Sequence, residues 1–324
     1  MKFIVTGAGG FIGHHLVSHL KKSGAEVIGI DIKHPEFEQS KADRFEIQDL
    51  REPITTWKHL FEGVDDVWAL AADMGGMGFI SQNHAQIMTS NVMINIHTLE
   101  AAKLAKVKRY LYTSSACVYP THLQSKTNVK PLAEDMAYPA DPQDGYGWEK
   151  IYTEKMCQYY HAEYALDTRI VRFHNIYGPA GTWRGGREKA PAALCRKVAE
   201  AIETGTDAIE IWGDGEQTRT FCYIDDCVTG LQKIMDSGYN EPLNLGRDEM
   251  VSINELADVV AEVAGVKLKK VHVDGPQGVR GRNSDNALFQ RLMGWSPAID
   301  LKTGIAQTYP WIQQQVRMGS KSPT

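Results

Sequence analysis

Short apolar runs, separated by longer stretches with helical spacing, occupy the first half of the chain. The runs, each predicted to be a strand, lie at residues 3–5, 26–30, 45–47, 66–70 and 108–113. Apolar positions three and four apart, the pattern of amphipathic helices, follow at residues 14–22, 82–105 and 146–164. Strands that alternate with helices predict a parallel sheet covered on both faces. We therefore expect an α/β fold with a doubly wound parallel sheet.

The pattern becomes less regular after residue 178, as expected of a smaller α/β domain that covers the carboxyl edge of the sheet. A helix is predicted to begin at Pro191, which suits a first helical turn. Residues 221–224 are predicted to return to the main sheet. Further elements are predicted at residues 209–212, 254–263 and 271–273. The final residues, 319–324, read as a disordered tail.

Composition narrows the classes of function. The 324 residues include 35 basic and 40 acidic side chains, and the net charge of -5 argues against nucleic acid or an anionic membrane as the main partner. No apolar run approaches the roughly 18 residues that cross a bilayer, and no secretion signal precedes the first strand, so we expect a cytoplasmic protein. Five scattered cysteines without a CxxC pair indicate neither disulfides nor a metal site.

A glycine loop follows the first predicted strand. Gly7, Gly10 and Gly13 allow a tight turn, close approach of backbone amides to a diphosphate, and close packing of helix on strand. Asp31 ends the second strand, about twenty residues further on, where a carboxylate meets the adenosine ribose and favours NAD over NADP. This context predicts a dinucleotide-binding Rossmann sheet. The alternative is a packing turn that binds no ligand.

The predicted boundaries follow from that assignment. The NAD-binding domain comprises residues 1–177 with a returning segment, 212–244, and the smaller domain comprises residues 178–211 and 245–324. Asp49, just beyond the third strand, is placed to contact the adenine, although a turn-capping aspartate is an equal alternative. The small, glycine-rich segment 71–78 follows the fourth strand and lets cofactor or substrate approach its backbone.

Three polar side chains are placed for hydride chemistry. Ser115 ends the fifth strand, and Tyr146 and Lys150, four residues apart, share one face of the following helix. A tyrosine near an ammonium group and a nicotinamide cation can have a depressed pKa and act as general base toward a sugar hydroxyl. A tyrosine and a lysine at this spacing occur by chance in many helices, so the prediction depends on the combination with the glycine loop and Asp31.

Taken together, these motifs resemble the extended short-chain dehydrogenase/reductase superfamily, in particular its nucleotide-sugar epimerases and dehydratases. The resemblance covers nearly the whole chain and is carried by residues 6–13, Ser115, Tyr146 with Lys150, and residues 172–179 and 213–219. It implies a bound NAD that is reduced and reoxidised within one turnover. The cofactor contacts that it implies are Gly7, Gly10, Phe11, Ile12, Gly13, Asp31, Asp49, Tyr146 and Lys150.

Residues after the fifth strand distinguish the reactions within this superfamily. The 4,6-dehydratases carry an acidic pair where this chain has Ala116 and Cys117, and 4-epimerases usually carry a small hydroxylated residue at the second position. Residues 71–80, 114–117, 181–193 and 278–286 instead resemble the nucleotide-sugar 3,5-epimerases. That resemblance implies GDP-mannose as substrate, with Cys117 as base and Lys189 as acid on opposite faces of the sugar ring.

The same resemblance places substrate at a set of residues from both halves of the chain. They are Gly75, Ser115, Ala116, Cys117, Tyr146, Asn175, Glu188, Lys189, Ala190, Lys197, Gln217, Thr218, Arg219 and Arg282. For Arg196 we expect an ordinary solvated position. The superfamily also implies a homodimer, in which the helices at 80–105 and 146–164 form a four-helix bundle with those of the second copy.

Two other functions are compatible with these motifs. One is a 4-epimerase or 4,6-dehydratase that acts on another nucleotide sugar, and the missing acidic pair argues against the dehydratase. The other is a non-catalytic regulator that binds NAD through the same fold, because a fold alone does not determine function. Such proteins typically lose the active-site tyrosine or lysine, and both are present here.

Overall fold

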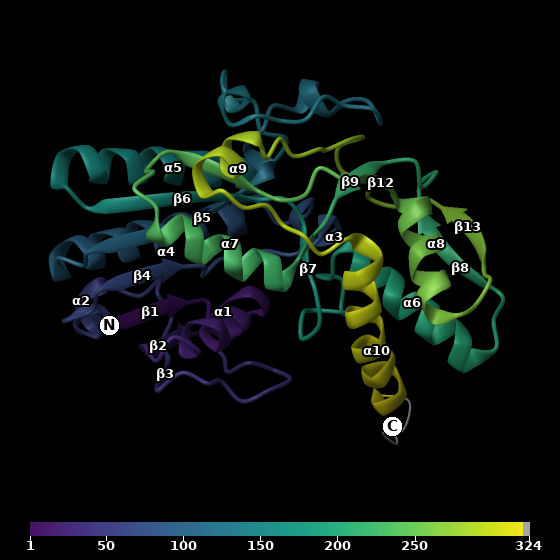
Figure 1. Cartoon of the computed structure of the whole chain (residues 1–324), viewed down its shortest axis with the longest axis horizontal. Helices are drawn as coiled ribbons and strands as arrows, with labels where there is room; N and C mark the ends of the chain where they lie inside the picture. Colours follow the sequence, from purple (N-terminus) through teal and green to yellow (C-terminus); the bar gives the residue numbers. More distant parts are fainter. Residues whose placement is uncertain (320–324) are drawn as a thin grey trace.

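Seven parallel strands form the central sheet of the computed structural model, which describes residues 1–319 (Figure 1). Their order across the sheet is β11-β6-β5-β4-β1-β2-β3. They are β1 (Lys2–Thr6), β2 (Glu26–Asp31), β3 (Arg44–Ile47), β4 (Asp66–Ala69), β5 (Arg109–Ser115), β6 (Asp167–Phe173) and β11 (Pro242–Leu245). This confirms the predicted α/β fold with a parallel sheet.

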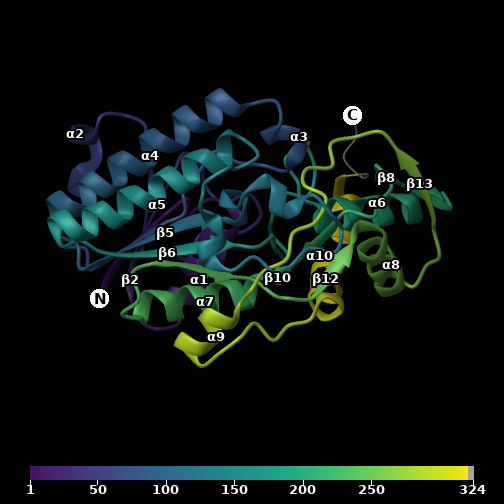
Figure 2. The same cartoon turned by 90° about the horizontal axis from the view of Figure 1, so that it is seen from above.

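Helices cover both faces of this sheet. In Figure 2, α4 (His84–Ala105) and α5 (Gly145–Tyr164) lie together on one side of the strands, and α1 (Phe11–Lys21) and α7 (Ile224–Asp236) lie on the other. The central strands are therefore buried on both faces: Val67 and Trp68, neighbours in β4, belong to separate cores. This is why the strand sequences are continuously apolar rather than alternating.

One predicted strand is placed differently. Residues 221–224 do not return to the main sheet: β10 (Cys222–Tyr223) pairs only with β7 (Ile176–Tyr177), and α7 begins at Ile224. The returning strand is β11, beside β6, and neither β6 nor β11 was predicted. Asn244 interrupts the apolar pattern of β11. Its buried amide donates to Leu132 O, so this polar side chain is hydrogen-bonded in the interior. The pattern of apolar residues alone therefore does not reveal the strand.

The second half of the chain adds a region at the carboxyl edge of the sheet (Figures 1 and 2). Two small sheets lie here, a parallel one of β8 (Ala208–Trp212) with β13 (Lys269–Val273) and an antiparallel one of β9 (Thr218–Thr220) with β12 (Met250–Ser252). The helices of this region are α6 (Ala190–Thr204), α8 (Ile253–Ala264), α9 (Ala287–Met293) and α10 (Leu301–Gly319). Short turns complete the fold: α2 (Ile54–Trp57), α3 (Met77–Ile80), η1 (Lys58–Phe61), η2 (Ala116–Val118), η3 (Thr121–Gln124) and η4 (Glu134–Ala137).

Local sequence explains where two helices begin. Pro191 lies in the first turn of α6, as predicted, and Lys189 is the residue that precedes this helix. Helix α1 begins at Phe11, three residues earlier than predicted, because the glycine loop ends at Gly10 and leads directly into the helix. The N–H groups of its first turn therefore lie directly beside the glycine loop.

A buried ion pair connects α5 to the sheet. Glu154 in α5 accepts from Arg172 of β6 at 2.7 Å and from Ser114 Oγ of β5 at 2.6 Å, and the side chains of Glu154 and Arg172 are only 1% exposed. Losing one partner of such a pair leaves a buried charge uncompensated. The contact fixes α5, which carries Tyr146, against the end of β5, which carries Ser115.

Two absences and one boundary complete the description. Within residues 1–319, no helix is long and apolar enough to cross a membrane, and no cluster of histidine, cysteine or carboxylate side chains has metal-binding geometry. Gly319, the first residue of the predicted tail, is the last residue of α10, and residues 320–324 lie outside the described part of the chain.

Candidate active site

A cavity of about 820 Å³ runs along the carboxyl ends of the parallel strands and continues into the second region of the chain. Its walls come from the glycine loop, the loop after β4, the end of β5, the start of α6 and the arginine loop near residue 280. Of the predicted site residues, it brings together all except Thr218. The Thr218 hydroxyl instead donates to Thr127 O at 2.5 Å.

The glycine loop is shaped for close approach. A Cβ on Gly13 would lie 2.1 Å from Gly7 O, and Gly7 itself has a φ of +72°. No side chain caps α1, and Phe11 and Ile12 of its first turn line the cavity, whereas Gly10 N donates to Gly7 O at 3.0 Å. This cradle of backbone donors at a helix N-terminus fits the diphosphate of a dinucleotide.

Gly13→Val is therefore expected to abolish dinucleotide binding. A Val side chain would push Gly7 O and the α1 N-terminus apart, because the contact is with backbone that cannot move aside. Isothermal titration with NAD should show no binding. Gly24→Val, where the added side chain meets nothing within 4 Å but φ is +77°, is a control for general strain and should retain binding.

Asp31 lines the cavity beside the glycine loop. Its carboxylate accepts from Gly9 N at 2.9 Å and from Lys33 N at 3.2 Å, and burial raises its pKa against the lowering effect of these bonds. Asp49 also lines the cavity, and its carboxylate pairs with the Arg51 guanidinium at 2.6 Å and accepts from Arg51 N. Asp49 thus caps a turn and also lines the cavity, and its contact with the adenine stays a prediction.

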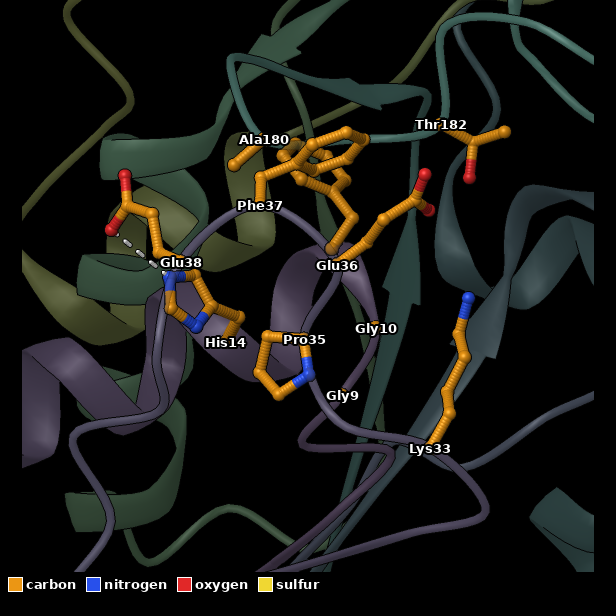
Figure 3. A pocket seen from close by; sticks show the side chains of 11 residues that line it. Gly9, Gly10, His14, Lys33, Pro35, Glu36, Phe37, Glu38, Ala180 and Thr182 are labelled. Carbon is orange, nitrogen blue, oxygen red and sulfur yellow. Dashed lines mark hydrogen bonds and ion pairs between the residues drawn. The ribbon is translucent and has the colours of Figure 1, made fainter.

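A second, small cavity of about 40 Å³ lies on the other side of the glycine loop (Figure 3). Residues 33–38 form one wall, and His14 pairs with Glu38 across 3.4 Å. Of the predicted site residues, only Gly10 and Phe11 line it. Its size suits water rather than a nucleotide.

Ser115, Tyr146 and Lys150 converge at the centre of the large cavity. Ser115 hydrogen-bonds the Tyr146 hydroxyl, and Lys150 Nζ lies 5.4 Å from the centre of the Tyr146 ring. Lys150 donates to Thr113 O at 3.0 Å and lies 3.7 Å from the Glu149 carboxylate. The predicted serine, tyrosine and lysine are thus assembled, with the ammonium group held behind the ring.

The electrostatics of Tyr146 differ from the expectation of a depressed pKa. Burial is the main cause that raises its pKa well above the ordinary value, and Cys117 and Glu149 add to this, whereas the bond from Ser115 lowers it. The depression expected from the sequence included the positive charge of a nicotinamide ring. The protein's own residues therefore favour the protonated phenol.

Cys117 faces two cationic residues from distant parts of the chain. Arg282 Nη1 donates to Cys117 Sγ at 3.3 Å. The ammonium group of Lys189, which precedes α6, interacts with the Cys117 charge; burial lowers the pKa of Lys189, with Arg282 lowering it further and Cys117 opposing. A lowered pKa makes the ammonium a stronger proton donor. A thiol and an ammonium group thus both line the cavity.

The other predicted substrate residues are already held in place by backbone contacts. Asn175, with a φ of +47°, donates to Thr220 O, Lys197 donates to Glu210 O, and Gln217 donates to Trp212 O. Arg219 donates to Val279 O at 2.7 Å, and burial, together with Arg282, lowers its pKa. Such bonds fix side chains before a ligand arrives, which reduces the entropic cost of binding.

Several cavity residues were not predicted. Arg196, expected on a solvated face, pairs with Glu188 at 3.2 Å and lines the cavity. Arg187 pairs with Asp73 across the cavity mouth at 2.9 Å. Gln124, outside the cavity lining, accepts from Arg282 Nε at 2.5 Å. The pairs Arg187–Asp73 and Arg282–Gln124 join segments more than 100 residues apart, which no spacing in the sequence indicates.

These features define a nucleotide-sugar enzyme with a Rossmann sheet, and comparison with known proteins agrees. The chain belongs to the NAD dependent epimerase/dehydratase family, whose model matches residues 3–246. Among its relatives, the chain is 50% identical to GDP-mannose 3,5-epimerase of Arabidopsis thaliana, over 98% of this chain and 83% of that protein. The cofactor is therefore NAD, for which the glycine cradle and Asp31 provide a fitting site.

Solved structures show the same architecture. UDP-glucose 4-epimerase of Thermotoga maritima, determined with UDP-glucose, superposes with a TM-score of 0.86 at 26% identity, covering 98% of this chain and 100% of that one. UDP-glucuronic acid 4-epimerase of Bacillus cereus, determined with UDP-glucuronic acid and NAD, gives 0.81 at 28% identity, covering 97% and 100%. These similarities extend across both regions of the chain.

Proposed function

We propose that this protein is an isomerase that inverts carbons 3 and 5 of GDP-D-mannose through a 4-keto intermediate to give GDP-L-galactose, with GDP-L-gulose from inversion at carbon 5 alone. The observation that carries the proposal is the position of the Cys117 thiol. It lies two residues beyond Ser115, bonded to Arg282, with the Lys189 ammonium close enough to interact with it. The 50% identity to a GDP-mannose 3,5-epimerase supports the same substrate.

The first step makes a ketone. Bound NAD supplies a hydride acceptor for carbon 4 and later a hydride donor. Tyr146 removes the proton from the 4-hydroxyl, and Ser115 holds that oxygen by hydrogen bonding. Lys150, which donates to Thr113 O, supplies positive charge behind the ring. A C–H beside an alcohol is too weakly acidic for a side chain to remove, and the ketone makes the neighbouring carbons acidic.

The second step inverts the neighbours of that ketone. Carbons 3 and 5 both flank carbon 4, so one oxidation activates two stereocentres through enolates. At each carbon Cys117 accepts the proton from one face and Lys189 returns a proton to the other, and proton exchange with water restores the thiolate and the ammonium before the second inversion. The guanidinium of Arg282 stabilises negative charge on the sulfur. Return of hydride to carbon 4 and of the proton from Tyr146 completes the reaction.

The remaining site residues are proposed to bind the nucleotide sugar. Gly75, Ala116, Asn175, Glu188 and Ala190 line the same cavity as the catalytic groups. Lys197, Gln217, Thr218, Arg219 and Arg282 come from the second region, where arginine forks suit diphosphate oxygens. The division into a cofactor domain (1–177 with 212–244) and a substrate domain (178–211 with 245–324) stays a prediction, and Gln217, Thr218 and Arg219 lie within the segment that it gives to the cofactor domain.

A homodimer is proposed as the working form. Helices α4 and α5 pack side by side and expose large apolar residues: Met88, Met93 and Leu104 on α4, and Trp148, Tyr152, Tyr159 and Tyr164 on α5. Exposed apolar surface of this kind marks protein interfaces. Pairing with the same two helices of a second copy would bury it in a four-helix bundle. The cytoplasmic location expected from the sequence stays a prediction.

Product analysis tests the function. The NAD-loaded protein is incubated with GDP-mannose, and the nucleotide sugars are separated and identified by NMR. GDP-L-galactose, with or without GDP-L-gulose, is the expected product. A 6-deoxy-4-keto sugar, or a sugar inverted only at carbon 4, would contradict the proposal, and NAD binding without turnover of GDP-mannose would favour a regulator.

A further inference from the structure

Gln124 is a buried amide whose orientation is fixed by its surroundings. It is 1% exposed, at the end of η3, outside the cavity lining. Its Nε2 donates to Tyr119 O at 2.9 Å and to Pro120 O at 3.3 Å. Because both carbonyls can only accept, the amide cannot flip without losing these bonds. The Oε1 atom must therefore face away from them.

That oxygen accepts from Arg282. The distance from Arg282 Nε to Gln124 Oε1 is 2.5 Å, and the guanidinium is planar, so fixing Nε also fixes the direction of Nη1. Nη1 donates to Cys117 Sγ at 3.3 Å. The Gln124 amide and the Arg282 guanidinium thus connect two backbone carbonyl groups to the Cys117 thiol.

The backbone of Gln124 also contacts the loop that carries Arg282. Gln124 O accepts from Arg280 N at 3.0 Å and from Gly281 N at 3.1 Å. A Cβ on Gly281 would lie 2.2 Å from Lys126 O, so the arginine loop approaches this segment closely only because residue 281 is glycine. Both the side chain and the main chain of Gln124 therefore hold the loop that carries Arg282 in position.

We propose that Gln124 is a positioning residue for Cys117: it orients Arg282 so that the guanidinium stabilises the thiolate that acts as base. The role of Cys117 as base rests on the proposed function, whereas the contacts that join Gln124, Arg282 and Cys117 do not. Gln124 touches neither the sulfur nor the cavity, and it acts only through Arg282.

Other charged groups also face the sulfur. Lys189 and Arg219 interact with its charge from α6 and β9, and Tyr146 faces it from α5. On its own element, Ser115 Oγ accepts from Cys117 N at 3.2 Å. Arg282 differs from the two other cations because it donates directly to Sγ. Misorienting it therefore removes a charge-assisted hydrogen bond and leaves the longer-range field in place.

The test is the pH dependence of Cys117 alkylation by iodoacetamide in the NAD-loaded protein without sugar. The other four cysteines are buried, so native alkylation reports on Cys117, and peptide mass spectrometry verifies the site. Gln124→Met fills the space without an acceptor. It should move the profile to higher pH and slow alkylation at pH 7 by about tenfold, the effect of one hydrogen bond to a charged group.

Two further variants make the outcome decisive. Arg282→Met should shift the profile in the same direction, and the Gln124→Met/Arg282→Met double variant should match Arg282→Met alone, because both changes act on one path. Gln124→Asn, which keeps the amide but is one methylene short of Arg282, should shift the profile in the same direction if Gln124→Met fails to fold. Thr98→Val removes a buried hydroxyl bonded to Tyr110 and should leave the profile unchanged.

An unchanged profile in Gln124→Met and Gln124→Asn would overturn the proposal, as would an additive effect in the double variant. These results are independent of the proposed function. If GDP-mannose is not epimerised but the profile shifts, the positioning role stands while the function fails. If GDP-mannose is epimerised and the profile does not shift, the function stands and the positioning role fails.

Discussion

Tyr146→Phe is expected to lower kcat for GDP-mannose by about 10³-fold, the usual contribution of a positioned acid-base group. The phenol is the group that would take the 4-hydroxyl proton. It lies against Ser115, and its ring centre is 5.4 Å from Lys150 Nζ. Without it no ketone forms, so both inversions stop together. Initial rates by NMR, with the product quantified against time, measure the loss.

The variant also has a diagnostic pattern. KM and NAD affinity should change little, because the ring of Phe fills the same buried space. Deuterium exchange into GDP-mannose should stop as completely as turnover. Tyr152→Phe, on an exposed part of the same helix, is the matched control and should behave like the wild type. Exchange at carbon 5 that survives in Tyr146→Phe would show that proton removal does not require the ketone.

Cys117→Ser should separate the two stages of the reaction. The hydroxyl of serine is a far weaker base than a thiolate, so inversion is expected to slow by about 10²- to 10⁴-fold while oxidation at carbon 4 continues. Absorbance at the wavelength of the reduced nicotinamide should therefore rise on adding GDP-mannose, and deuterium uptake should be suppressed. NAD should remain bound, because the thiol does not touch the glycine cradle.

Cys157→Ala provides the control for loss of a thiol. Cys157 is buried in α5, and burial raises its pKa, so it has no route to the sugar. The variant should exchange deuterium at the wild-type rate. Normal exchange in Cys117→Ser would remove the thiol from the mechanism and assign the base to another group in the cavity.

Sequence reasoning recovered the parts of this protein whose signal is local. The glycine loop, Asp31 and the strand endings lie within short segments, and parallel strands carry their carboxyl ends to one edge, so Ser115 and Tyr146 could be placed together before the fold was known. The chemical identity of the site depended on a resemblance in longer blocks, since a thiol such as Cys117 has no local pattern that marks it as a base.

What the sequence did not reveal depends on distant contacts. Strand β11 carries a buried Asn244, which interrupts its apolar pattern, and the prediction that residues 221–224 return to the main sheet is wrong. Arg196 is expected on the solvated face of its helix, but it forms an ion pair with Glu188 and lines the cavity. The raised pKa of Tyr146 follows from burial, which no spacing of residues predicts.

The most direct test of the account is proton exchange during turnover. The NAD-loaded protein is incubated with GDP-mannose in deuterated water, and the products are examined by NMR and mass spectrometry. The account predicts deuterium at carbons 3 and 5 of GDP-L-galactose and at carbon 5 of GDP-L-gulose, while carbon 4 keeps its original hydrogen because the same hydride returns to it. Epimerised product without deuterium at carbons 3 and 5 would contradict it.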